Sequence, residues 1–271
     1  MVEDDRGMIV AGCDIGALTA KAVVLNNDVM LGSEIIQSRS NAAQSAVEVT
    51  DKLLKRLALA YSDIDYCVGT GYGRNIVPFA NDNVSEISCH GRGATWLVPT
   101  IRTIIDGGGQ DCKAIRVDDN GFVKDFRMNT KCAAGTGRAL ELMAESLGVD
   151  VSQLGPLSLE ASDPVVLQEP CCVLTEIEIR YLVFEGRDSA DIAAGINDIT
   201  ARRILHLVRN LGVRKDVGIT GGIAKNIGVV SCLERALKTT FVQFPVDPQI
   251  IGAVGAALFA ADKAGKLHSL A

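Results

Sequence analysis

The chain has 271 residues, which is long enough for two lobes or for one large core. Hydrophobic residues make up 48% of it and charged residues 22%, and 27 Lys and Arg against 33 Asp and Glu leave a net charge of −6. This composition excludes a disordered chain and a strongly basic nucleic-acid-binding protein, so we expect no nucleic-acid partner.

The longest nearly apolar run, at 250–261, has 12 residues. A membrane-spanning helix needs roughly 20. The N-terminal MVEDDRGMIV is acidic and lacks the basic and long apolar regions of a signal peptide. We therefore expect a soluble, cytoplasmic protein with no membrane partner.

The N-terminal third of the chain shows a strand, a glycine-containing turn and a second strand. Residues 8–14 are apolar, 16–21 are small and hydroxylated, and 22–25 are apolar again. Apolar residues at helical spacing follow over 46–60. A short strand is expected at 66–68, before the glycine-rich segment GTGYG.

The strand and turn pattern then recurs. Residues 104–106 run into the turn GGGQD at 107–111, and 114–117 are apolar again. Each copy opens with an Asp at a strand end before a glycine turn, which predicts a duplicated α/β fold with a cleft between the copies. From 133 onward the chain is mostly helical, with helices expected at 172–184, 190–211 and 250–264 and a strand at 217–220.

The first turn carries the residue types that bind a nucleotide phosphate. Gly16 lets backbone N–H groups approach the oxygens, Thr19 adds a hydroxyl donor, and Asp14 can hold Mg²⁺ or its waters. Lys21 is a candidate phosphate contact. Alone, such a turn fits an ordinary tight turn equally well.

The second turn repeats most of these features. Asp106 is the carboxylate, Gly108 and Gly109 supply the backbone, and the amide of Gln110 can orient an attacking water. A third turn, at Gly221 and Gly222, follows a later strand and is suited to adenosine. The P-loop and the Gly-x-Gly-x-x-Gly fingerprint are both missing from the sequence, so the three turns predict a nucleotide site of another architecture.

The eight cysteines show no Cys-x-x-Cys spacing, which argues against a zinc ribbon or a self-contained ferredoxin-type cluster. Cys132 and Cys171 each stand at a predicted helix start, where free N–H groups favour a thiolate. A [4Fe–4S] cluster takes four thiolates, so two from each subunit of a dimer would complete one. Because Cys172 adjoins Cys171, the sequence leaves open which of the two is the second ligand. The other five are expected in the core: Cys13, Cys67, Cys89, Cys112 and Cys232.

Several motifs together resemble the BadF/BadG/BcrA/BcrD-type ATPase family of the actin, Hsp70 and sugar-kinase superfamily. They are TGYGR at 70–74, SEISCH at 85–90, the Asp106 turn, KCAAGTGR at 131–138, Cys171 with Val173 and Glu176, and Gly221 with Gly222. The family activates 2-hydroxyacyl-CoA dehydratases and forms the ATP-hydrolysing subunits of benzoyl-CoA reductase. The resemblance implies a two-lobed actin-like fold of duplicated ribonuclease-H-like domains, with lobe I at 1–98 plus 248–271 and lobe II at 99–247.

The resemblance also implies cofactors and partners. These are ATP, Mg²⁺ and a [4Fe–4S] cluster shared by two identical or homologous subunits through Cys132 and Cys171. Further partners are a CoA-ester-reducing iron–sulfur component and a ferredoxin or flavodoxin as electron source. Ala17, Gly107 and the string CCVLTE at 171–176 depart from the typical activator and favour a benzoyl-CoA reductase-type subunit. The alternatives are a homodimeric dehydratase activator and, more remotely, a small-molecule kinase of this fold without a cluster.

Overall fold

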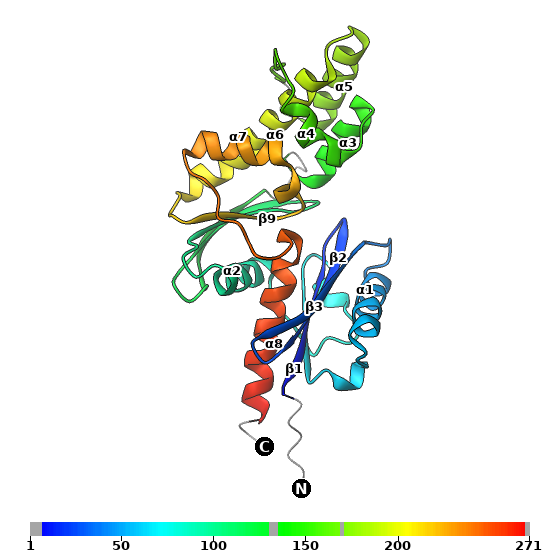
Figure 1. Cartoon of the computed structure of the whole chain (residues 1–271), viewed down its shortest axis with the longest axis vertical. Coiled ribbons are helices and arrows are strands. Elements are labelled where there is room, and N and C mark those ends of the chain that lie inside the picture. The colour runs from blue at the N-terminus through cyan, green and yellow to red at the C-terminus, as the bar shows by residue number, and fades with distance from the viewer. Residues whose placement is uncertain (1–6, 130–134, 169–170, 269–271) are drawn as a thin grey trace. The chain divides into compact units, whose positions relative to one another are not determined.

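The structure is a computed structural model that describes residues 7–129, 135–168 and 171–268. The chain forms two compact units (Figure 1). The first contains Met1–Pro99, Asp118–Val123 and Pro245–Ala271, and the second contains Thr100–Val117 and Lys124–Phe244. The turn Asp118–Val123 belongs to the first unit, where a Cβ on Gly121 would lie 3.1 Å from the Thr95 Cβ.

The first unit is built on a five-stranded mixed sheet with the order β3-β2-β1-β4-β5. Its central strand pairs antiparallel with β2 and parallel with β4. The strands are β1 (Ile9–Ile15), β2 (Thr19–Asn26), β3 (Val29–Gln37), β4 (Tyr66–Thr70) and β5 (Asp82–Asn83).

Helices cover both faces of this sheet, as α1 and α8 show in Figure 1. Every residue of β1 is buried, because successive side chains point to opposite faces and each face packs against a helix. One core joins β1 and β2 to α1 (Ala42–Leu57), and another joins them to α8 (Ile251–His268). A Cβ on Gly12 would clash with the Ala253 carbonyl, so the lack of a side chain at Gly12 allows α8 to approach β1 closely. The unit also contains α2 (Glu86–Leu97).

The second unit has a four-stranded sheet with the order β8-β7-β6-β9. The strand β6 (Thr103–Gly107) pairs antiparallel with β7 (Cys112–Val117) and parallel with β9 (Val217–Gly221). At the edge lies β8 (Val123–Met128). The order β7-β6-β9 repeats the order β2-β1-β4 of the first unit, so each unit places a glycine hairpin beside a parallel strand.

Most helices of the second unit are amphipathic and pack on one core with this sheet. They are α3 (Gly137–Leu147), α4 (Leu154–Ser158), α5 (Cys172–Phe184), α6 (Ser189–Leu211) and α7 (Ile227–Leu237). Short 3-10 helices lie at Tyr61–Asp63, Arg74–Ile76, Val151–Gln153, Gly222–Lys225 and Pro248–Ile250. The expected helices at 172–184 and 190–211 are confirmed.

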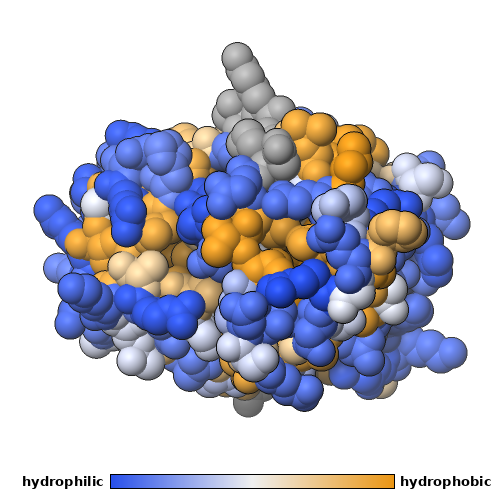
Figure 2. Space-filling view, turned by 90° about the horizontal axis from the view of Figure 1, so that it is seen from above, coloured by the Kyte–Doolittle hydropathy of each residue, from blue (hydrophilic) through white to orange (hydrophobic). Residues whose placement is uncertain are grey.

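The helix α5 differs from the others because most of its surface is exposed. Only Thr175 and Ile179 are buried. Figure 2, which views the molecule from the α5 end of Figure 1, shows apolar surface beside hydrophilic side chains. The exposed apolar side chains of α5 are Val173, Leu174, Ile177, Tyr181, Val183 and Phe184.

Candidate functional site: two glycine hairpins and a cysteine-capped helix

The first hairpin brings its four predicted residues together. Asp14 and Lys21 are direct partners in the β1–β2 pairing, and Lys21 Nζ lies 3.2 Å from Asp14 Oδ2. Both side chains are buried. The Gly16 N–H donates to the Thr19 carbonyl at 3.0 Å, which closes the turn. A Cβ on Gly16 would lie 3.1 Å from Lys21 Nζ, so a larger residue would crowd the ammonium group.

The strand β4 completes the surroundings of Asp14. Thr70 is the parallel partner of Asp14, and Gly71 follows with φ +84°. A Cβ on Gly71 would clash with Asp14 Oδ1. From the other side, a Cβ on Gly252 would lie 3.1 Å from Asp14 Oδ2 and 3.0 Å from His90 Nε2. Glycine backbone therefore approaches this carboxylate from two segments.

The second hairpin repeats this arrangement. Asp106 and Lys113 are partners in the β6–β7 pairing. Lys113 Nζ lies 3.5 Å from Asp106 Oδ2 and 2.6 Å from Asp111 Oδ1. The Thr220 hydroxyl donates to Asp106 Oδ1 at 3.2 Å. The Gly108 N–H donates to the Asp111 carbonyl at 2.9 Å, as Gly16 does in the first hairpin.

The third glycine turn lies beside the second within the same unit. Gly221 pairs with Gly107 across β6 and β9 and has φ +80°. A Cβ on Gly221 would lie 2.9 Å from Asp106 Oδ1, and a Cβ on Gly107 would lie 2.5 Å from the Ile223 Cβ. Gly222 is exposed and begins the following 3-10 helix. The packing thus explains why Gly107 and Gly221 have no side chain.

The second hairpin is bonded to the start of α3. The Gly137 N–H donates to the Gly108 carbonyl, and the Arg138 N–H donates to the Gly109 carbonyl, both at 2.9 Å. Gln110 is exposed at the tip of the same turn, where a ligand can reach its amide. The candidate ligand Cys132 lies outside the described residues, five positions before Gly137 in the sequence.

Cys171 caps the N-terminus of α5 and is half-buried. Backbone N–H groups of Leu174 and Val173 lower the pKa of its thiol, and the Arg203 charge and the Cys172 side chain add to the effect. This is the environment that thiolate ligands need. Among the described residues, no three His, Cys, Asp or Glu side chains form a metal site.

Four of the other cysteines are buried, as expected: Cys13, Cys67, Cys89 and Cys112. Burial raises the pKa of both Cys67 and Cys89 to about 12, and it also raises the pKa of Cys13 and Cys112. Cys232, expected in the core, is only half-buried. Low thiol pKa therefore distinguishes Cys171 from these cysteines.

The chain matches the BadF/BadG/BcrA/BcrD ATPase family over residues 11–260. It belongs to this family. The predicted family and its ATPase activity are therefore confirmed. Within the described residues, no helix of this ATPase is both long and apolar enough to cross a membrane.

Three comparisons place the chain within the family. The 2-hydroxyisocaproyl-CoA dehydratase activator of Clostridioides difficile is 42% identical over 258 residues, 95% of this chain and 96% of that protein. The solved structure of the activator of the 2-hydroxyisocaproyl-CoA dehydratase from Clostridium difficile with bound ADPNP is 40% identical, with a TM-score of 0.93 and coverage of 97% and 98%. A benzoyl-CoA reductase subunit of Thauera aromatica is 32% identical over 272 residues, 97% of this chain and 96% of that one.

These likenesses confirm the actin-like ATPase fold and correct one preference. The departures at Ala17, Gly107 and 171–176 favoured a benzoyl-CoA reductase-type subunit. Identities of 42% and 40% to the activators against 32% to the reductase subunit favour the alternative instead. Local departures in three short segments weigh less than identity along the whole chain.

Each hairpin of this ATPase and the parallel strand beside it thus carry the same four residue types: Asp, Lys, Thr and Gly. We call these two sets of residues the first and second quartets. The first quartet is Asp14, Lys21, Thr70 and Gly71, and the second is Asp106, Lys113, Thr220 and Gly221. Sequence analysis missed Lys113 and Thr220. A signal for Lys113 existed, because Lys113 follows Asp106 by seven residues, as Lys21 follows Asp14.

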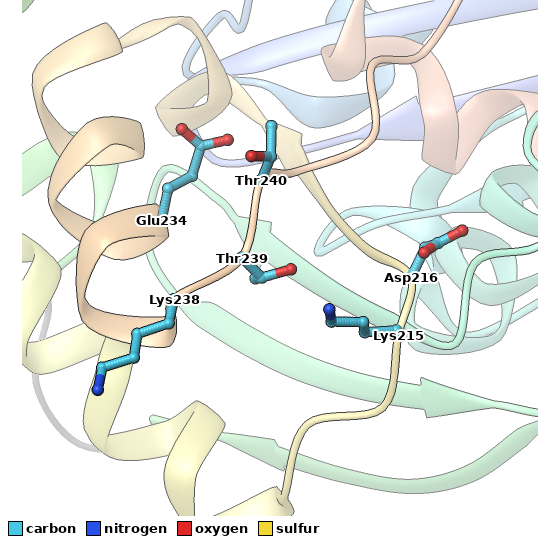
Figure 3. A pocket seen from close by; sticks show the side chains of 6 residues that line it. All are labelled: Lys215, Asp216, Glu234, Lys238, Thr239 and Thr240. Atoms are coloured by element: carbon cyan, nitrogen blue, oxygen red, sulfur yellow. The ribbon is translucent and has the colours of Figure 1, made fainter.

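An open pocket of about 620 Å³ lies at the opposite end of β9 from Gly221 (Figure 3). Its lining comes from the residues before β9 and from the end of α7: Lys215, Asp216, Glu234, Lys238, Thr239 and Thr240. The Lys238 amine points away from the other labelled side chains (Figure 3). The Glu234 carboxylate accepts the Phe241 N–H at 2.7 Å. These residues are separate from the glycine turns.

Proposed function

We propose that this ATPase activates a 2-hydroxyacyl-CoA dehydratase by passing low-potential electrons to its CoA-ester-reducing component. One observation carries the coupling of ATP to redox chemistry: the backbone bonds from Gly137 and Arg138 to the second glycine turn. They link the nucleotide turn to the helix that follows the Cys132 segment. The likeness to dehydratase activators supports the choice of partner.

Mg-ATP is held by the residues of the glycine turns. Asp14 and Asp106 bind Mg²⁺ or its waters, and the backbone at Gly16, Gly108 and Gly109 faces the phosphates, with Thr19 and Lys21 as further donors. Gly221 and Gly222 accommodate adenosine. The ADPNP bound in the solved activator structure supports nucleotide binding by this fold. Hydrolysis needs positioning and charge stabilisation rather than a protein nucleophile, and the exposed Gln110 amide is suited to orient the water.

Cys132 and Cys171 supply the thiolates for a [4Fe–4S] cluster, and a second, identical or homologous copy supplies the other two. When bound, the cluster provides one-electron redox chemistry. Two observations favour Cys171 over Cys172: the low thiol pKa of Cys171, and the packing of Cys172 against the hydrophobic core. The exposed apolar side chains of α5 support a partner at this end of the unit, because monomers rarely expose such patches.

The proposed electron source is a ferredoxin or flavodoxin. Binding and hydrolysis of ATP change the position of the turn at Gly108 and Gly109, and α3 follows because its first N–H groups are bonded there. A nucleotide-dependent movement of α3 is then the step that controls electron delivery.

The test begins with iron and acid-labile sulfide on anaerobically purified protein. We expect about two irons per chain from a shared four-iron cluster, lost in Cys132→Ala and Cys171→Ala and kept in Cys172→Ala. Iron-free wild-type protein under strict anaerobiosis would overturn the redox proposal and favour a kinase-like role.

A second test separates the two CoA-ester systems. The iron-loaded protein, with ATP and a reduced ferredoxin, is added to a purified 2-hydroxyacyl-CoA dehydratase component and, separately, to the substrate-reducing subunits of a benzoyl-CoA reductase. We expect activation of the dehydratase only. Turnover with the reductase subunits alone would restore the benzoyl-CoA reductase alternative.

A further inference from the structure

Two sequence motifs that the nucleotide site leaves unexplained, TGYGR at 70–74 and SEISCH at 85–90, are joined by an ion pair. Arg74 belongs to the first motif and Glu86 to the second, and Arg74 Nη1 lies 3.0 Å from Glu86 Oε2. The same Nη1 donates to the Gly71 carbonyl at 3.2 Å. One nitrogen of Arg74 therefore connects the Gly71 turn to the first residue of α2.

The Gly71 turn limits where the Asp14 carboxylate can lie. A Cβ on Gly71 would clash with Asp14 Oδ1 and would lie 2.7 Å from the Ile15 carbonyl oxygen, so the backbone of the turn packs directly on both groups. The Gly73 N–H also donates to the Ile15 carbonyl at 2.9 Å. Movement of this turn away from β1 would open space beside Oδ1 and let the carboxylate rotate.

The second carboxylate is oriented in a different way. Asp106 Oδ1 accepts a hydrogen bond from the Thr220 hydroxyl at 3.2 Å. Thr70 has the equivalent position in the first unit, as the parallel partner of Asp14, but its fully buried hydroxyl makes no such bond. Packing of the Gly71 turn is therefore the restraint on Asp14 Oδ1 that takes the place of a threonine hydrogen bond.

We propose that Arg74 and Glu86 are positioning residues that hold the Gly71 turn against Asp14, and that they thereby fix this carboxylate in the orientation that binds Mg²⁺ or its waters. The inference rests on the proposed function, in which Asp14 has that role, and a carboxylate oxygen is the kind of ligand that Mg²⁺ takes. Groups that orient a metal ligand without touching the metal change metal affinity or activity by about 10- to 100-fold.

Another ion pair on the same helix provides a matched control. Arg92, also on α2, pairs with Asp262 of α8 at 3.5 Å. The exposed fractions of the Arg92 and Arg74 side chains are nearly the same, 32% and 34%. Arg92→Gln therefore removes an arginine ion pair from α2 and leaves the bonds of the Gly71 turn in place.

The experiment measures binding of a fluorescent ATP analogue by the full-length protein, once with Mg²⁺ and once with EDTA. The readout is the gain in affinity that Mg²⁺ produces, because a defect of packing alone lowers the affinity in both buffers. We expect this gain to fall about tenfold in Arg74→Gln and in Glu86→Gln, and no further in the double variant, because both changes break one contact. Arg92→Gln keeps the gain.

Arg74→Lys is the conservative variant. Because a single nitrogen of Arg74 makes both bonds, an ammonium group can replace it, and we expect Arg74→Lys to recover most of the gain. Circular dichroism checks that each variant folds. If Arg74→Gln does not fold, Glu86→Gln and Arg74→Lys decide the question by the same readout.

Three results would overturn the positioning role. They are a wild-type gain in the folded Arg74→Gln and Glu86→Gln variants, equal losses of affinity in Mg²⁺ and in EDTA, and losses that add in the double variant. Asp14→Asn separates this inference from the proposed function. If Asp14→Asn keeps the gain, the assignment of Asp14 itself is wrong. If only Asp14→Asn loses the gain, the assignment of Asp14 stands and the role of Arg74 and Glu86 is refuted.

Discussion

The two quartets share residue types and strand pairings, but their turns are held by different parts of the chain. In the first hairpin, the Ser38 hydroxyl donates to the Gly16 carbonyl at 2.8 Å, and the Ser38 N–H donates to the Leu18 carbonyl at 2.9 Å. Ser38 directly follows β3, so this turn is fastened to its own sheet. In the second hairpin, the equivalent bonds come from Gly137 and Arg138 of α3.

This difference indicates a division of labour between the two hairpins: the first supports a phosphate, and the second also transmits a change to α3. A turn fastened to its sheet can only support a phosphate. A turn fastened to a helix transmits a change in the phosphate to that helix. The proposed coupling of ATP to electron transfer therefore depends on the second hairpin, while we expect both hairpins to contribute to hydrolysis.

The largest expected effect is loss of hydrolysis when either quartet loses its carboxylate. Asp14→Asn and Asp106→Asn should each lower the ATPase rate about 100-fold or more, because each removes a carboxylate that is proposed to hold the Mg²⁺, and Mg²⁺ stabilises the charge on the phosphates. The measurement is phosphate release, with circular dichroism as a check of folding. A folded Asp106→Asn variant with wild-type turnover would remove Asp106 from the site.

Replacing a quartet glycine by alanine should lower the free energy of unfolding more than the same replacement at an ordinary glycine with positive φ. Gly71→Ala and Gly221→Ala combine a positive φ with a clash against the hairpin, and we expect a cost above about 1–3 kcal/mol, the range for backbone strain alone. Gly148→Ala is the control, because its φ is +79° but no atom lies within 4 Å of the added Cβ. Chemical denaturation gives the three values, and equal losses at all three positions would argue against tight packing in the quartets.

The connection to α3 can be removed without removing the helix. Gly137 is the first residue of α3, a position where proline is tolerated, and Gly137→Pro deletes the N–H that bonds the Gly108 carbonyl. We expect ATPase activity to remain within a fewfold of wild type and ATP-dependent electron transfer to fall more strongly. The ratio of electrons transferred to ATP hydrolysed measures the effect.

Ser38→Ala is the matched change in the first hairpin. It deletes the hydroxyl that bonds the Gly16 carbonyl and should cost about 1 kcal/mol of stability. The ratio of electrons to ATP should stay at the wild-type value. A fall in this ratio for Ser38→Ala as large as for Gly137→Pro would contradict the division of labour.

The smallest effect concerns thiol reactivity in iron-free protein. Cys171 should be alkylated faster than the buried Cys67 and Cys89, because its pKa is below the usual thiol value and theirs are raised to about 12. Its rate should fall as the pH is lowered through that depressed pKa, since the thiolate is then protonated. Peptide mass spectrometry after brief iodoacetamide treatment gives the order, and faster labelling of Cys67 than of Cys171 would contradict it.

The sequence by itself determined the local features of this protein. An Asp before a glycine turn, repeated at 14 and at 106, was sufficient to predict two hairpins and a duplicated α/β fold. Helical spacing predicted α5 and α6 within about one residue of their observed bounds. These features succeed because strand alternation and glycine turns depend on residues close together in the chain.

Only the tertiary structure decided what the hairpins are connected to. The pairing of β6 with β9 joins Asp106 to Thr220, 114 residues away, and completes the second quartet. The bond from the Gly137 N–H to the Gly108 carbonyl also depends on packing. Sequence periodicity does not predict such contacts, because they arise when separate elements bury their apolar faces against one another.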